Sequence, residues 1–221
     1  MPKKQMLHLE MRWKIAQQLE HRWWRNYLKG KDPAAYLEWK QDYWLHFLDR
    51  CGIEMPTNKA QVLDAGCGPA GIYSVLDRHN VVAIDPLLEA YDKLDHFERR
   101  QYPWVRFITS TIEDFQIPQT FDWVFCLNAI NHVVDIHRGY DRLVEALKPN
   151  GTLIMSIDAH NYRFPKWLFR SLPLDALHPH QYTLDEYKNV LVSRGLQIER
   201  IELIKEERIF NYYAIVAKRN A

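Results

Sequence analysis

A short apolar strand that runs directly into a glycine-rich turn constrains the fold of this chain more than any other feature. Residues 61–65 read QVLDA, and residues 66–71 read GCGPAG, a G-x-G-x-x-G pattern. Glycines at these positions let the backbone turn tightly and let a ligand approach it without an intervening Cβ. The pattern therefore predicts a buried strand, a ligand-binding turn and a helix after the glycines.

Further short apolar runs follow the glycine turn at intervals that leave room for helices. They occupy residues 81–85, 104–109, 123–128 and 152–157. Because apolar residues occupy most positions of each run, we predict strands that are buried on both faces. After a predicted helix at 185–195, residues 197–206 and 208–219 alternate in polarity with no helix between them, which indicates a hairpin. The sequence predicts a doubly wound, mostly parallel α/β sheet with crossover helices and a C-terminal antiparallel hairpin.

The first 50 residues are rich in aromatic side chains and hold five of the eight tryptophans. A stripe with i+4 spacing predicts a helix over about residues 5–28, and it consists of Met11, Ile15, Leu19, Trp23 and Tyr27. Gly30 ends this helix, and Asp32 with Pro33 begins a second helix that ends at residues 51–52. The second helix has a predicted inner face of Tyr36, Trp39, Tyr43 and Phe47. Such stripes pack a core more often than they cover a ligand, and both alternatives stay open.

The composition argues against several classes of protein. The chain has 29 basic and 28 acidic residues, so its net charge of +1 gives no overall field that would attract nucleic acid or an anionic membrane. Cys51, Cys67 and Cys126 lack C-x-x-C spacing, which disfavours a disulfide framework and a cysteine zinc site. No apolar run approaches the roughly 18 residues of a membrane span. We predict a soluble, cytoplasmic protein with neither a nucleic-acid nor a membrane partner.

An acidic residue at the end of the second predicted strand narrows the identity of the ligand. Asp85 follows Gly66 by 19 residues, the spacing of a carboxylate that binds ribose hydroxyls. NAD and S-adenosylmethionine both carry such a ribose. Asp64, at the mouth of the glycine turn, would repel an NAD pyrophosphate, whereas S-adenosylmethionine presents an ammonium and a sulfonium. The sequence therefore favours S-adenosylmethionine.

From residue 60 to about 218, the chain resembles the class I S-adenosylmethionine-dependent methyltransferases. The acidic residue before the glycine turn is similar to the first motif of that family, and residues 121–125, FDWVF, are similar to its fourth strand. The resemblance implies a seven-stranded Rossmann-like domain at 53–221 and a helical extension or lid at 1–52. It also implies that S-adenosylmethionine contacts Asp64, Gly66, Gly68, Asp85, Pro86, Leu87, Thr111, Ile112, Glu113 and Asn128. Thr111 stands where many relatives have Asp, so we expect backbone groups or Glu113 to recognise the adenine amine.

The loop after the fourth predicted strand contains the candidate catalytic residue. In the family that the chain resembles, this loop passes the reactive methyl, which implies that Asn128 contacts the cofactor and that His132 faces the acceptor. Alternatively, Asn131 and His132 only cap the next helix, for which Asp135 is the predicted N-cap. The chain has neither the Asn/Asp-Pro-Pro-aromatic tetrad nor the Pro-Cys pair of enzymes that methylate nucleic-acid bases.

Residues 158–182 leave the carboxyl end of the fifth predicted strand, where ligands bind in open α/β sheets, and are expected to form an acceptor wall. The candidate acceptor-binding residues are Trp23, Tyr27, His160, His178, His180 and Tyr182. As an alternative, His178 and His180 only shape a proline turn before the helix that Thr183 caps. A metal site that combines these two histidines with Asp158 and His160 is disfavoured, because nothing brings the four together.

These observations predict an S-adenosylmethionine-dependent methyltransferase that acts on a small organic molecule, with the acceptor atom (N, O or C) left open. An NAD-dependent oxidoreductase is the first alternative, and it is disfavoured by Asp64 and by the lack of a substrate domain after the sheet. A non-catalytic module that binds a cofactor or another protein is the second alternative.

Overall fold

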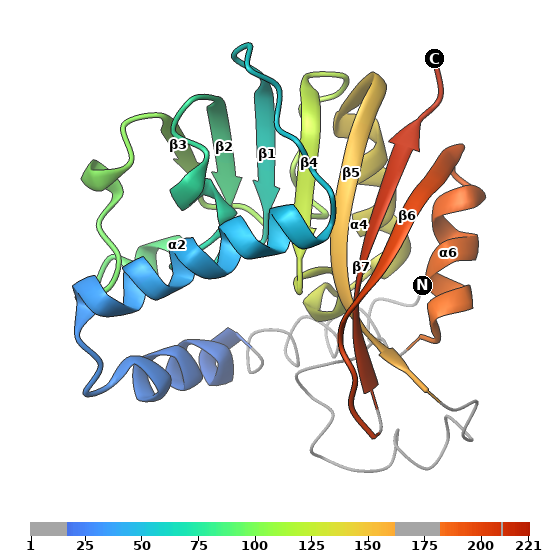
Figure 1. The fold of residues 1–221 in the computed structure, drawn as a ribbon. Helices are drawn as coiled ribbons and strands as arrows, with labels where there is room; N and C mark the ends of the chain where they lie inside the picture. Colours follow the sequence, from blue (N-terminus) through green and yellow to red (C-terminus); the bar gives the residue numbers. More distant parts are fainter. Residues whose placement is uncertain (1–16, 162–181, 209) are drawn as a thin grey trace, which may run out of the picture.

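A computed structural model describes residues 17–161, 182–208 and 210–221 of the chain. Its centre is a seven-stranded sheet in the order β3-β2-β1-β4-β5-β7-β6 (Figure 1). The strands are β1 (Gln61–Ala65), β2 (Asn80–Ile84), β3 (Val105–Ile108), β4 (Phe121–Leu127), β5 (Leu147–His160), β6 (Leu196–Lys205) and β7 (Phe210–Arg219). The first five strands pair in parallel, and β7 is antiparallel to both β5 and β6. The mostly parallel Rossmann-like sheet with a C-terminal hairpin is therefore confirmed.

The strand order reverses at β1, which pairs with β2 on one side and with β4 on the other. In open α/β sheets, such a reversal leaves a crevice outside the carboxyl ends of the two central strands. The glycine turn follows β1, and the loop with the predicted catalytic residue follows β4. The topology thus brings these two segments to the same edge of the sheet.

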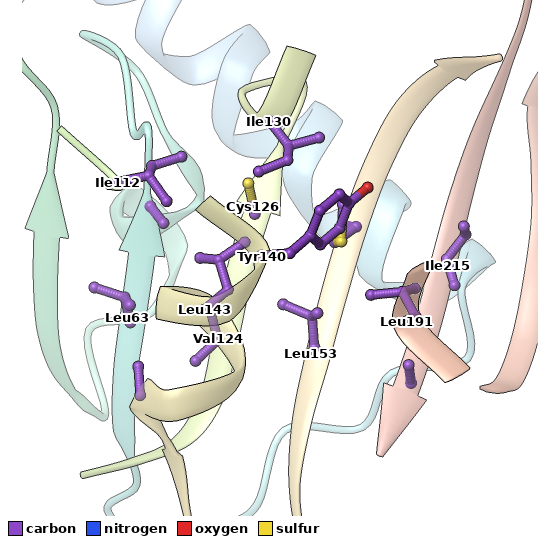
Figure 2. Packing of buried hydrophobic residues seen from close by; sticks show 14 of the residues in the cluster. Leu63, Ile112, Val124, Cys126, Ile130, Tyr140, Leu143, Leu153, Leu191 and Ile215 are labelled. Atoms are coloured by element: carbon purple, nitrogen blue, oxygen red, sulfur yellow. The ribbon is translucent and has the colours of Figure 1, made fainter. Parts of the chain in front are cut away.

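One face of the sheet is covered by α4 (Ile136–Ala146) and α6 (Leu184–Val192). Figure 2 shows Tyr140 and Leu143 of α4 and Leu191 of α6 among apolar side chains of the strands. Asp135 caps α4 by accepting hydrogen bonds from two backbone N–H groups, each with a donor–acceptor distance of 3.1 Å. Thr183 begins α6 with a capping box. Both predicted caps are therefore confirmed.

The opposite face is covered by α2 (Pro33–Arg50), which crosses the sheet near the carboxyl ends of β1 and β4 (Figure 1). Asp32 caps this helix by accepting a hydrogen bond from the Ala35 N–H over 2.9 Å. Trp44, Phe47 and Leu48 are buried in the same cluster as side chains of β1, β2 and β4. The helix therefore contributes to the core, and a division at residue 52 stays a prediction.

Two of the predicted helices on this face are replaced by shorter segments. The glycine turn leads into η1 (Ile72–Val75), a 3-10 helix, where we expected a regular helix. Between β2 and β3 there are only α3 (Leu88–Tyr91) and η2 (Arg99–Gln101). The fully buried ring of Tyr73 in η1 packs against Tyr102 at 5.0 Å and Phe107 at 5.1 Å. Because these rings and α2 already fill this face, there is no room for long crossover helices.

The predicted inner faces of the two N-terminal helices are partly wrong. A helix at residues 17–28 precedes α2, but Leu19 is 41% and Trp23 51% exposed, and Trp39 of α2 is 52% exposed. The predicted Tyr36 and Phe47 are buried, and Tyr27 and Tyr43 pack against the core, whereas Trp24, Leu28 and Trp44 pack inward without having been predicted to do so. The predicted stripes and the buried faces overlap, because residues at i+3 and i+4 spacing lie on neighbouring parts of one helix surface. The first part of the predicted stripe, Met11 and Ile15, lies outside the described residues.

The three cysteines are buried free thiols. Burial raises the pKa of the Cys51 thiol to about 11, so this group stays protonated near neutral pH. Among the residues that the structure describes, no helix is both long enough and apolar enough to cross a membrane.

Candidate functional site

A cavity of about 630 Å³ lies where the glycine turn, the loop after β4 and the two N-terminal helices meet. This volume falls within the range of about 300–1,000 Å³ that is typical of small-molecule sites. The cofactor residues predicted from the sequence that line it are Gly66, Gly68, Asp85, Pro86, Thr111, Ile112, Glu113 and Asn128. His132 lines the same cavity, so the predicted cofactor wall and the predicted catalytic residue share one space.

The glycine turn forms a bare backbone wall that fits an adenosine-type cofactor. Gly66 and Gly68 have φ angles of +74° and +59°, a region that side chains rarely adopt. A Cβ on Gly66 would overlap the side chain of Ala129 in the loop after β4. A Cβ on Gly68 would lie 3.6 Å from the Trp24 ring, in the space between this turn and the helix of residues 17–28. The glycine at position 66 therefore lets the loop after β4 pack closely, and the glycine at position 68 leaves the space beside the turn open to a ligand.

Asp85 directly follows β2, and its carboxylate holds the backbone of the glycine turn in place. Its Oδ2 accepts a hydrogen bond from the Gly68 N–H over 3.0 Å, and its Oδ1 accepts one from the Leu87 N–H over 2.8 Å. Burial, and secondly the nearby carboxylate of Glu20, raise the pKa of Asp85 to about 7. Leu87 contributes this N–H but does not line the cavity.

Replacing Asp85 with alanine should weaken the binding of S-adenosylhomocysteine by about tenfold or more. The ribose would lose charge-assisted hydrogen bonds, which contribute roughly 1.5–3 kcal/mol, and the glycine turn would lose its acceptor. Isothermal titration calorimetry on the folded variant measures this loss. Asp77→Ala is a matched control, because Asp77 is exposed and lies outside the cavity. Unchanged affinity of Asp85→Ala would contradict the assignment of Asp85 to the ribose.

Asp64 is buried behind the glycine turn and not on the cavity wall. Its Oδ2 accepts a hydrogen bond from the Tyr73 N–H over 3.1 Å, at the start of η1. A Cβ on Gly71 would come within 2.6 Å of the same oxygen, so the turn packs directly on this carboxylate. Burial raises the pKa of Asp64 to about 7, and the charge of Asp85 adds to this effect. Asp64 therefore stabilises the glycine turn from the side that faces away from the cavity.

The raised pKa of Asp64 predicts a pH-dependent stability that Asp64→Asn should remove. The pKa is about 7 in the folded chain, against the ordinary value of 3.8. The folded state therefore binds a proton more tightly, and the stability from this group is lost as the pH rises from about 4 to 7. The free energy of unfolding of the wild type should fall relative to Asp64→Asn by up to about 1.4 kcal/mol per pH unit. Parallel curves from urea unfolding at several pH values would contradict this expectation.

The loop after β3 places Thr111, Ile112 and Glu113 on the cavity wall. The Thr111 hydroxyl donates to Asp114 Oδ2 over 2.9 Å and accepts from the Asp114 N–H over 3.1 Å. Glu113 Oε1 accepts hydrogen bonds from the Val134 N–H over 2.7 Å and the Asp135 N–H over 3.3 Å. Glu113 thus joins the loop after β3 to the loop after β4. Its recognition of the adenine amine stays a prediction.

Asn131 and His132, the two candidate polar residues of the loop after β4, have different surroundings. Asn131 is buried and its Oδ1 accepts a hydrogen bond from the Tyr187 hydroxyl of α6 over 2.5 Å. His132 ends η3 (Ile130–His132) and lines the cavity. Asp135, and neither of these residues, caps α4. Asn131 therefore fixes the loop on α6 while His132 faces the ligand space.

The candidate acceptor residues are only partly brought together. Trp23 lines the cavity, and Tyr27 stacks on it at 4.8 Å without lining the cavity itself. His160 packs on Phe210 at 4.2 Å, and Tyr182 packs on Tyr187 at 5.4 Å, both away from the cavity wall. The predicted acceptor residues His178 and His180 lie outside the described residues, as does most of the segment 158–182. In the described part of the chain, no group of three or more His, Cys, Asp or Glu residues could hold a metal ion.

Several polar residues of the cavity were missed by the sequence analysis. They are Gln17, Glu20, Lys40, Tyr43, Lys205, Glu207 and Tyr212. Asp158 also lines the cavity, and it belongs to the segment 158–182 that was expected to form the acceptor wall. The Tyr212 hydroxyl donates to the Ser156 hydroxyl over 2.6 Å. Burial raises the pKa of Tyr43, so its hydroxyl stays protonated near neutral pH, and this hydroxyl is hydrogen-bonded to Tyr212. A signal was available for Lys40, Tyr43 and Trp44, because i, i+3 and i+4 spacing places them on one face of α2.

Comparisons with known proteins agree with this geometry. The family described as "Methyltransferase domain" matches residues 63–155. A ubiquinone biosynthesis O-methyltransferase from Rickettsia typhi is 33% identical over 155 residues, which cover 65% of this chain and 58% of that protein. The chain spans less than two thirds of the length of the curated relatives it matches.

Solved structures share the fold. A 1,6-didemethyltoxoflavin-N1-methyltransferase from Burkholderia thailandensis, with S-adenosylhomocysteine bound, has a TM-score of 0.62 at 17% identity and covers 94% of this chain and 90% of its own. The [4+2]-cyclase SpnF has a TM-score of 0.65 at 12% identity, over 82% of this chain and 81% of its own. The second structure carries a name other than methyltransferase, so the fold alone does not define the reaction.

Residues 63–155 match the methyltransferase family, and the glycine turn and the sheet agree with the fold of a class I S-adenosylmethionine-dependent methyltransferase domain. S-adenosylmethionine is the ligand in a solved phosphoethanolamine N-methyltransferase from Haemonchus contortus, which has a TM-score of 0.63 at 16% identity over 89% of this chain and 60% of its own.

Proposed function

We propose that this protein transfers a methyl group from S-adenosylmethionine to a small organic molecule. The observation that carries the proposal is the single cavity that joins the glycine turn and Asp85 to His132 and the side chains of α2. A cofactor held on the first wall would present its reactive end to a second ligand on the other wall. Holding two reactants in line in this way supplies most of the acceleration of such a transfer.

In this proposal, residues on the cofactor wall bind and those on the opposite wall orient the acceptor. Gly66 and Gly68 let the cofactor lie on the backbone, Asp85 binds its ribose, and Glu113 and Ile112 lie beside its adenine. S-adenosylmethionine supplies an already activated methyl on its sulfonium. His132 accepts the proton of the acceptor, and the helix of residues 17–28 together with α2 keeps water away from the reacting atoms.

The side chains of the wall opposite the cofactor indicate which class of acceptor the cavity would bind. Two hydroxyls and a carboxylate, from Tyr43, Tyr212 and Asp158, line the same cavity as the rings of Trp23 and Trp24. Such a mixture suits an organic molecule with an aromatic or other apolar body and a polar group. The relatives include both an O-methyltransferase and an N-methyltransferase by name, so the acceptor atom is oxygen or nitrogen in this proposal. The buried free thiols favour a reducing compartment such as the cytoplasm.

Two measurements test the proposed function. Calorimetric titration of the purified protein should show that S-adenosylhomocysteine binds and that NAD does not. Incubation with methyl-labelled S-adenosylmethionine and a metabolite extract should then transfer the label to a small molecule that mass spectrometry identifies. Binding of NAD in its place would favour an oxidoreductase. Cofactor binding without any transfer would favour a module that uses the fold for another purpose.

A further inference from the structure

The outer side of the helix of residues 17–28 carries exposed apolar side chains. Leu19 and Trp23 lie four residues apart, so they share one stripe of the helix, and they are 41% and 51% exposed. Trp23 also lines the cavity, so this stripe reaches the place where the cavity opens to solvent. A chain of ring contacts continues through Tyr27 and Tyr36 to Trp39 of α2, which is 52% exposed. The two N-terminal helices therefore expose two indole rings, one of them at the cavity opening.

The exposed charged residues of the same segment are all basic. Between residues 17 and 31 they are Arg22, Arg25, Lys29 and Lys31. Glu20, the one acidic residue in this range, lines the cavity and is partly buried. Arg22, Arg25 and Lys29 are three and four residues apart, so they form a basic stripe next to the apolar stripe on the exposed side of the helix. The net charge of +1 for the whole chain therefore conceals a local positive surface.

A membrane with anionic lipids fits this combination of side chains better than two other kinds of partner. Indole rings favour the level of the lipid headgroups, where arginine and lysine side chains meet the negative surface of anionic lipids. A symmetric contact with a second copy of the chain would bring the same cations together, and they would repel each other. A single-stranded nucleic acid would pair with the cations, but Leu19 offers no ring on which a base could stack.

We propose that a basic aromatic surface, formed by Leu19, Trp23, Arg22, Arg25 and Lys29, binds membranes that contain anionic lipids. Since Trp23 belongs both to this surface and to the cavity wall, binding in this orientation turns the cavity opening toward the lipid. An acceptor with an apolar body would then enter the cavity from the lipid, a consequence that rests on the proposed function. Membrane binding itself does not rest on it, because neither cofactor nor acceptor is needed.

Sedimentation of the full chain with lipid vesicles tests the basic aromatic surface. One set of vesicles consists of phosphatidylcholine, and the other also contains about 30% phosphatidylglycerol, which supplies the negative surface charge. The variants are Arg22→Gln combined with Arg25→Gln, and Trp23→Ser. The matched control combines Lys59→Gln with Arg78→Gln, because these exposed residues precede β1 and β2, at the end of the sheet opposite the glycine turn. Thermal unfolding verifies that each variant is folded.

The wild type should bind the phosphatidylglycerol vesicles about tenfold or more tightly than the others, and high salt should weaken this binding by screening the charges. The arginine pair should lose about tenfold or more in affinity, since each basic residue near the surface contributes roughly fivefold. Trp23→Ser should also bind more weakly, whereas the control should match the wild type.

A wild type that binds neither kind of vesicle would overturn the proposal, and so would equal losses in the arginine pair and in the control. Tighter binding to a short single-stranded RNA than to the anionic vesicles would assign the surface to nucleic acid and overturn it as well. Because no cofactor is present in these measurements, none of their outcomes decides whether the protein transfers a methyl group.

Discussion

A valine at position 68 is expected to abolish S-adenosylhomocysteine binding while the protein stays folded. The Cβ of this residue would project from the glycine turn toward Trp24, into the space assigned to the cofactor, and a branched side chain would fill more of that space. The φ angle of +59° adds a backbone strain of about 1–2 kcal/mol for any residue with a Cβ. This strain is small against the stability of about 5–15 kcal/mol of a typical domain. The ligand should therefore be lost before the fold is.

Gly195→Val is the matched control for this experiment. Gly195 has a φ angle of +79°, and a Cβ there would meet no atom within 4 Å. The control carries a comparable backbone strain at the end of α6, away from the cavity, so calorimetry should show unchanged affinity. Near wild-type affinity of Gly68→Val would refute the assignment of the glycine turn to the cofactor. Equal losses in both variants would point to strain as the cause.

Substitution of His132 by alanine should lower the catalytic constant by about a hundredfold or more and leave the affinity for S-adenosylhomocysteine nearly unchanged. Removal of a general base typically costs this much, because the base acts only while the acceptor loses its proton. Steady-state kinetics with the acceptor found in the labelling experiment gives the catalytic constant. Calorimetry gives the cofactor affinity of the same preparation.

His137→Ala controls for the loss of an imidazole near the site. His137 is exposed on α4 and does not line the cavity, so both measurements should match the wild type. A parallel loss of cofactor affinity in His132→Ala would assign His132 to the cofactor. Full activity of His132→Ala would leave the residue a structural part of the loop after β4.

The strands of the sheet could be predicted because the residue pattern of each short segment indicates a buried strand. Residues 61–65 and 123–128 are short, mostly apolar runs, and β1 and β4 occupy nearly the same positions. The glycine turn and Asp85 were also predictable, since a positive φ angle and a carboxylate at a strand end leave direct marks in the sequence. The short η1 was not predictable, because its length depends on how Tyr73 and α2 share one face of the sheet.

The α2 side of the cavity was harder to predict for a related reason. The sequence of an amphipathic helix shows that one face is buried. Which side chains of that face contact the rest of the protein depends on individual contacts with segments far away in the sequence. For α2 such a contact joins the Trp44 indole to the Ala70 carbonyl, across 26 positions of the chain. Trp44 is buried in the core cluster and makes this contact, whereas Trp39, five positions earlier on another part of the helix surface, is 52% exposed.

The same indole contact also bears on how the protein can be altered. In the proposed function, α2 supplies side chains to the acceptor wall, and its Trp44 also donates a hydrogen bond to the turn on which the cofactor lies. We therefore expect that a substitution in α2 that admits a new acceptor also changes the affinity for the methyl donor. Engineering that changes the acceptor range would then have to restore donor affinity as well.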